Sequence, residues 1–167
     1  MKTFPKLLIA TAALAAAMAA QAQVSKKDQD FMTRAAAGGL YEVAAGTLAQ
    51  EKGRSPTVKA FGEMLIKDHT AANGELKALA SAKGVTLPAA VPADKKKRLD
   101  KIAKAKDFDK EFVDEVGVDD HKKDIQLFEK ASKDADDAEV KAFAAKTLPT
   151  LKAHHEHAEG LKKAYGQ

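Results

Sequence analysis

The 167-residue chain contains no cysteine and no tryptophan, and only two tyrosines and five prolines. Without cysteine it can form neither a disulfide framework nor the lipid anchor of a lipoprotein. Residues with branched β-carbons are sparse and no strand-like alternation appears, whereas alanine, lysine, glutamate and aspartate dominate. The sequence therefore predicts helix nearly throughout.

A long apolar run lies at the N-terminus. Lys2 and Lys6 precede an apolar stretch of about 14 residues, and Ala20-Gln21-Ala22 then supplies the small residues of a signal-peptidase site. A membrane-spanning helix would need about 20 apolar residues. We therefore predict a signal peptide over residues 1–22, a mature chain that begins near Gln23 without a transmembrane anchor, and a secreted, periplasmic protein.

Charge is nearly balanced in that mature chain, which keeps 26 basic and 24 acidic side chains. The basic run Lys95-Lys96-Lys97-Arg98 is flanked by acids and has no aromatic neighbour, unlike a nucleic-acid-binding stripe. We predict a solvated face there and no nucleic-acid partner. The serines near helix ends, Ser55, Ser81 and Ser132, have no histidine at a spacing that implies a triad. The sequence therefore favours a protein that is not an enzyme.

Apolar spacing predicts four long helices, over residues 28–52, 56–83, 107–133 and 137–165. Ser55-Pro56 is a typical helix start, and Ser25 with Asp28 offers a capping box for the first helix. The long connection 84–106 contains two prolines and has room for a short helix over 93–105. Pro149 should kink the last helix or free the carbonyl group of Ala145.

Three glycines of the first predicted helix, Gly38, Gly39 and Gly46, each cost about 1 kcal/mol relative to alanine. They predict that another helix approaches closely there. The sequence also repeats itself, since Val58-Lys59-Ala60-Phe61 recurs as Val140-Lys141-Ala142-Phe143. The repeat indicates two helical hairpins joined by a long crossover. We therefore predict a single all-α domain over 23–167 with the ferritin-like four-helix-bundle fold.

The five histidines divide by their positions on these helices. His69, His121 and His154 each lie on an apolar seam of a different helix, and Glu42 projects into the bundle or sits on its shoulder. At about 1.5 Å rise per residue, all four fall near mid-height. Imidazole and carboxylate suit zinc, copper or iron, so these four residues are the candidate ligands of a divalent metal. The sequence requires no cofactor.

His155 and His157 flank the seam and should lie nearer solvent. They leave a weaker, exposed alternative, formed by His155 with Glu159 or by His154 with His157. Two further interpretations stay open. The inward histidines and Glu42 could form a polar layer that satisfies its own hydrogen bonds in a structural or interaction protein. Shared titration of the histidines would instead make a pH switch, with stability lost between about pH 7 and 5.

Several segments spread over the mature chain form a recognisable set: Gly38-Gly39-Leu40-Tyr41-Glu42-Val43, Val58-Lys59-Ala60-Phe61 with Asp68-His69, Phe108-Asp109 with Asp120-His121 and Phe128-Glu129-Lys130, and Lys141-Ala142-Phe143-Ala144 through Leu148-Pro149-Thr150-Leu151 to His154. Together they resemble a bacterial family of secreted domains of unknown function, often described as outer-membrane or periplasmic proteins and grouped with ferritin-like folds. The resemblance implies a helical bundle without an established activity. Di-iron bundles use Glu-x-x-His pairs; this sequence has none, so we expect no di-iron centre.

Overall fold

The computed structural model describes residues 24–165, and the predicted signal peptide, residues 1–22, lies outside the described residues. The described part is helical and contains no strand, which confirms the all-α prediction. Its elements are α1 Lys26–Lys52, α2 Pro56–Ala82, α3 Ala93–Ala103, α4 Phe108–Phe112, the π-helix η1 Val113–Asp120, α5 His121–Asp134 and α6 Ala138–Tyr165.

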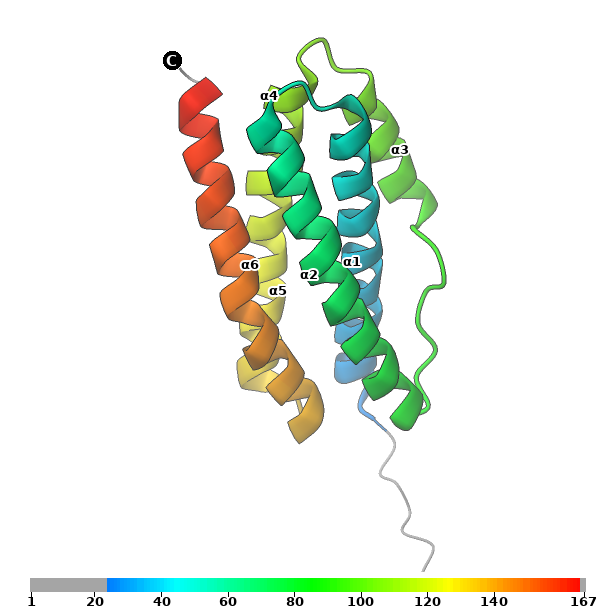
Figure 1. Cartoon of the computed structure of the whole chain (residues 1–167). Coiled ribbons are helices and arrows are strands. Elements are labelled where there is room, and N and C mark those ends of the chain that lie inside the picture. Colours follow the sequence, from blue (N-terminus) through cyan, green and yellow to red (C-terminus); the bar gives the residue numbers. More distant parts are fainter. Residues whose placement is uncertain (1–23, 166–167) are drawn as a thin grey trace, which may run out of the picture.

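These elements form a four-helix bundle made of two antiparallel hairpins (Figure 1). The first hairpin is α1 with α2. In the second, α4, η1 and α5 follow one another as a single rod that packs against α6. The crossover with α3 runs along the outside of α1 and returns the chain to the end where α2 began, so α2 and the rod run parallel. This is the predicted ferritin-like arrangement with one long crossover.

Apolar side chains form two core clusters, one toward each end of the bundle. The cluster nearer the start of α1 includes Leu76 and Leu151, and the other includes Leu65 and Ala158. His69 lies between Leu65 and Leu76 on α2, and His154 lies between Leu151 and Ala158 on α6. The polar residues of interest therefore occupy a layer between two apolar cores.

Two aspartates join one hairpin to the other. The Asp28 carboxylate accepts backbone N–H bonds from Asp136 at 3.1 Å and from Asp137 at 2.7 Å, in the α5–α6 turn. Ser25 does cap α1 by accepting from the N–H of Asp28. The predicted reciprocal capping box is wrong, however, because the Asp28 side chain reaches across to the other hairpin instead.

Asp109 is the counterpart of Asp28 in the second hairpin. Its carboxylate accepts backbone N–H bonds from Arg54 at 3.0 Å and Ser55 at 2.7 Å, in the α1–α2 turn. Asp28 precedes Phe31 by three residues, and Asp109 precedes Phe112 by the same interval. The duplication seen in the sequence thus extends to a matched pair of contacts between the hairpins.

Close helix approach at the glycines of α1 is confirmed. A Cβ atom on Gly46 would lie 2.5 Å from the carbonyl oxygen of Gly62 on α2, closer than any real contact. A Cβ atom on Gly39 would meet the Asn73 side chain at 1.9 Å, and one on Gly38 would lie 3.5 Å from the Asp124 carboxylate. Gly46 admits a neighbouring backbone, while Gly38 and Gly39 admit polar side chains into the bundle.

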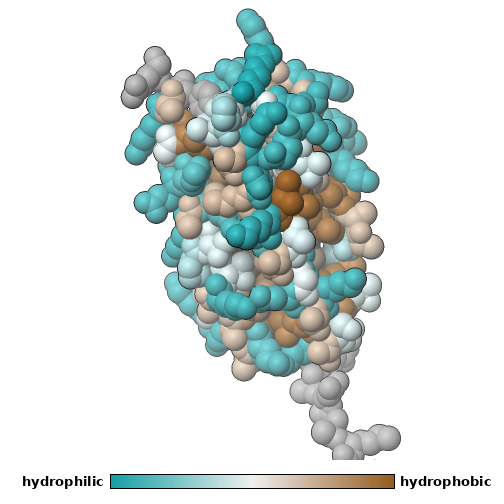
Figure 2. All heavy atoms as spheres, viewed as in Figure 1, coloured by the Kyte–Doolittle hydropathy of each residue, from teal (hydrophilic) through white to brown (hydrophobic). Residues whose placement is uncertain are grey.

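Polar side chains cover most of the face in Figure 2, with smaller apolar patches between them. None of the helices within residues 24–165 is long and apolar enough to span a membrane. Pro149 lies inside α6, and helical structure continues on both sides of it.

Candidate metal centre

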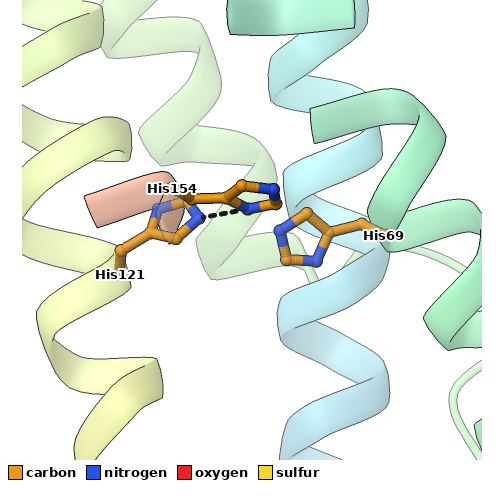
Figure 3. A group of neighbouring side chains, drawn as sticks. All are labelled: His69, His121 and His154. Atoms are coloured by element: carbon orange, nitrogen blue, oxygen red, sulfur yellow. Dashed lines mark hydrogen bonds between the residues drawn. The ribbon is translucent and has the colours of Figure 1, made fainter. Parts of the chain in front are cut away.

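Three histidines from three different elements meet in the polar layer. His69 comes from α2, His121 begins α5 and His154 comes from α6, and all three are buried. The ring centroids are 5.7 Å apart for His69 and His121, 5.4 Å for His69 and His154, and 5.3 Å for His121 and His154. One nitrogen from each ring lies within 4.8 Å of the other two. Figure 3 shows the three rings gathered close together.

The π-helix η1 fixes the orientation of His121. Nδ1 of His121 lies 2.9 Å from the backbone carbonyl oxygen of Val116, five residues earlier. A carbonyl can only accept a hydrogen bond, so Nδ1 must carry the proton and Nε2 must keep its lone pair. Single-turn π segments often occur at functional sites. The helix prediction missed η1, although the low helix propensity of the valines around Gly117 was a signal for it.

An aspartate fixes the orientation of His154. Nε2 of His154 lies 3.0 Å from Oδ2 of Asp68 on α2. An ionised carboxylate also only accepts, so Nε2 of His154 carries the proton and Nδ1 keeps its lone pair. Asp68 therefore belongs to the candidate site, and sequence reasoning missed it. It is adjacent to His69 in the chain, yet it serves the histidine of the opposite helix.

These two assignments leave a conflict between the rings. Nε2 of His121 and Nδ1 of His154 lie 3.3 Å apart (Figure 3). If both imidazoles are neutral, each carries a single N–H, and those two protons already point at Val116 and Asp68. Two lone pairs then face each other. A positive charge between them, either a proton or a metal ion, would remove this conflict.

Burial disfavours the proton. It lowers the pKa of His121 to about 4 and lowers the pKa of His154, with Asp68 acting in the opposite direction. The pKa of His69 is lowered well below its usual value, first by burial and then by the other two histidines. The rings are accordingly neutral at neutral pH, which is the form that binds a metal ion.

The spacing of the rings suits a small metal ion. Two nitrogens that bind one ion at about 2.0–2.1 Å in tetrahedral geometry lie about 3.3 Å apart. Nε2 of His69 is buried and has no hydrogen-bond partner among the described residues. The ligand nitrogens of the three rings lie within 4.8 Å of one another, so His69 would have to move closer to the other two rings to share an ion with them. In histidine metal sites the imidazole that binds the ion is neutral, and its other ring nitrogen typically donates a hydrogen bond to a carbonyl or a carboxylate. His121 and His154 both have such a partner.

Glu42 is not part of this group. It is fully buried on α1, and neither of its carboxylate oxygens has a hydrogen-bond partner within the described part of the chain. Burial raises its pKa well above the usual value, and the nearby charges of Asp124 and Asp120 add to this effect. The four candidate ligands are thus divided into three histidines and a separate carboxyl group.

The predicted self-satisfied polar layer is only half formed. His121 and His154 have partners, whereas the carboxyl group of Glu42 and Nε2 of His69 do not, within residues 24–165. The exposed alternatives do not join the group either. Nε2 of His155 lies 3.8 Å from Oε1 of Glu159, and the ring of His157 stacks on Phe61 with centroids 5.4 Å apart.

Solved structures of similar shape share the fold at low sequence identity. A DUF305 fragment from Deinococcus radiodurans has a TM-score of 0.73 at 10% identity, covering 84% of this chain and 98% of its own. CopM in its Cu(I)-bound form has a TM-score of 0.70 at 16% identity, covering 83% and 96%. CopM bound to silver has a TM-score of 0.69 at 19% identity, covering 86% and 98%.

No curated protein matches the sequence significantly. A family described as a domain of unknown function, DUF4142, matches residues 13–161. Because the match spans most of the sequence and the helical bundle agrees with it, the chain belongs to the DUF4142 family.

Proposed function

We propose that this protein binds a single copper ion through His69, His121 and His154. The proposal rests on the two lone pairs of His121 and His154 that face each other. They call for a positive charge between them, and burial disfavours protonation of either ring. Nε2 of His121, Nδ1 of His154 and Nε2 of His69 would be the ligand atoms. The Val116 carbonyl and the Asp68 carboxylate would hold the first two rings in place.

Chemistry and likeness both favour copper. Imidazole nitrogen suits copper and zinc, and three buried rings offer no carboxylate oxygen for a harder cation. Structures of similar fold carry Cu(I), Cu(II) or silver, and this likeness supports copper over zinc. The proposed role is to hold the ion rather than to catalyse a reaction.

Metal titration tests the proposal. The mature protein would be titrated with Cu(II), with Cu(I) under reducing conditions, and with zinc, while bound metal and melting temperature are measured. We expect one copper ion per chain, and stabilisation of about 2.7 kcal/mol when free copper is 100 times Kd. His121→Ala and His154→Ala should abolish this stabilisation, whereas His155→Ala and His157→Ala should keep it.

Two results would contradict the proposal. One is the absence of stoichiometric copper binding to the wild-type protein, which would leave the histidines as a structural polar layer. The other is binding that disappears in His155→Ala and persists in His154→Ala, which would move the site to the surface. Asp68→Asn serves as a graded test, because loss of the orienting carboxylate should weaken binding by about 10- to 100-fold.

We also propose that the site works in the periplasm. The predicted signal peptide supports this location, and the absence of cysteine is compatible with an oxidising compartment. N-terminal sequencing of protein released from the periplasm should find Gln23 first. Retention of residues 1–22 in cytoplasmic protein would contradict it.

A further inference from the structure

A polar pocket opens beside the histidine layer. Its volume is about 220 Å³, and it lies between α1, α3, η1 and α5. Its charged lining residues are Arg34, Glu42, Lys95, Asp120, Lys123 and Asp124. The proposed copper site makes no use of this pocket, although the pocket contains the buried carboxyl group of Glu42.

Three of these charged residues, Asp120, Lys123 and Lys95, already have partners. Asp120 accepts from the Tyr41 hydroxyl at 3.0 Å and lies 2.9 Å from Nη1 of Arg98 and 3.4 Å from Nζ of Lys123. Nζ of Lys95 sits 4.7 Å from the centre of the Tyr41 ring. Glu42 differs from these residues, because it is fully buried and both of its oxygens lack a partner in the described structure.

Asp124 connects this pocket to the histidines. It lines the polar pocket together with Glu42, and it also lines a small internal cavity of about 20 Å³ together with His69, Asn73 and Thr147. Its carboxylate occupies the space that Gly38 leaves open on α1. Asp124 therefore lines both the polar pocket and the small cavity that reaches His69.

We propose that the pocket is the access route of the metal cation, and that the carboxyl groups of Glu42 and Asp124 release their protons as they bind the ion and then pass it to His69. This proposal rests on the proposed copper binding. Oxygen donors bind a partly hydrated cation, and the imidazole nitrogens then hold copper in place of its water. Glu42, predicted as a ligand of the final site, becomes a ligand of the ion in transit.

Rapid mixing of apoprotein with Cu(II), followed through the copper–imidazole absorbance, measures the association and dissociation rates of copper. These rates distinguish a residue on the access route from a residue that supports the final site. Wild-type binding is measured first, at equilibrium. Asp124→Asn should slow association by about tenfold and slow dissociation similarly, so that Kd changes little. Asp119→Asn removes the same charge from an exposed position that lines neither cavity, and it should leave both rates unchanged. Gly38→Leu should slow association without changing charge, by filling the passage beside Asp124.

Each outcome decides between the two proposals. If the wild-type protein binds no copper, the proposed function fails, and the route fails with it. If copper binds and Asp124→Asn and Gly38→Leu associate at the wild-type rate, the route is wrong while the copper site stands. Faster dissociation of copper from Asp124→Asn at an unchanged association rate would also overturn the route, because it would make Asp124 a support of the final site.

Discussion

The three histidines differ in the hydrogen-bond partners of their ring nitrogens. His121 has one nitrogen fixed by a backbone carbonyl, and His154 has one fixed by Asp68. His69 has a buried nitrogen with no partner among residues 24–165. Helical spacing identified these three residues as inward-facing. It could not assign the nitrogens, because the groups that fix them lie on other helices or in a π-helix.

The ionisable groups of the layer respond to pH in opposite directions. The lowered pKa values of the three histidines reduce stability as pH falls from about 7 toward 4, because the unfolded chain takes up protons first. The raised pKa values of Glu42 and of Asp124, the latter about 6, act the other way, because the folded chain takes up protons first. These effects offset each other, so the loss of stability between pH 7 and 5 expected from the sequence is not a necessary result.

Replacing Glu42 isolates one of these effects. The raised pKa of Glu42 means that its contribution to stability is present below about pH 4.5 and is lost as pH rises. Glu42→Gln cannot ionise, so its stability relative to wild type should increase as pH rises from about 4.5 to about 8. Urea unfolding of the apoprotein at several pH values measures this. A stability difference between Glu42→Gln and wild type that stays constant with pH would refute the prediction.

At the level of elements, η1 decides where His121 points. Phe108, Phe112 and Val116 form an apolar stripe at helical spacing. In a regular α-helix this stripe would continue on the same face through the residues that follow. The wider turn of a π-helix changes the phase for every later residue. Phe31 precedes Glu42 by eleven residues, and Phe112 precedes Asp124 by twelve. The interval in the second hairpin is therefore one residue longer, as a single π-type insertion would make it.

The α1–α2 contact makes a sharp prediction about two glycines. A methyl group on Gly46 would meet the carbonyl of Gly62 at 2.5 Å and Ile66 at 2.8 Å. Gly46→Ala should therefore destabilise the protein by about 1–3 kcal/mol through overpacking. Gly74 lies on α2, where an added methyl group would have open space for 4 Å around it, and Gly74→Ala should gain up to about 1 kcal/mol from helix propensity. Equal stabilities of the two variants in urea would show that the helices can separate freely at Gly46.

For the whole molecule, the paired aspartates tie the hairpins together at opposite ends of the bundle. Asp28→Ala would leave the backbone N–H groups of Asp136 and Asp137 without their acceptor. We expect a loss of about 2–4 kcal/mol in the free energy of unfolding, and a similar loss for Asp109→Ala. The exposed neighbour Asp30→Ala should change stability by less than about 0.5 kcal/mol. Guanidinium unfolding compares the three variants, and an unchanged midpoint for Asp28→Ala would mean that water replaces the carboxylate.

The sequence alone determined the helices, the duplicated hairpins and the three inward histidines, because these depend on local propensity and on the 3.6-residue period. Only the tertiary structure placed Asp68 beside His154, left Glu42 outside the group of three histidines, and made Asp124 line both the polar pocket and the cavity at His69. Those relations depend on which helices are neighbours and on a one-residue change of phase in η1. Neither the choice of neighbouring helices nor the phase change in η1 produces a periodic pattern in the sequence, because the packing of the whole bundle determines which distant elements are in contact.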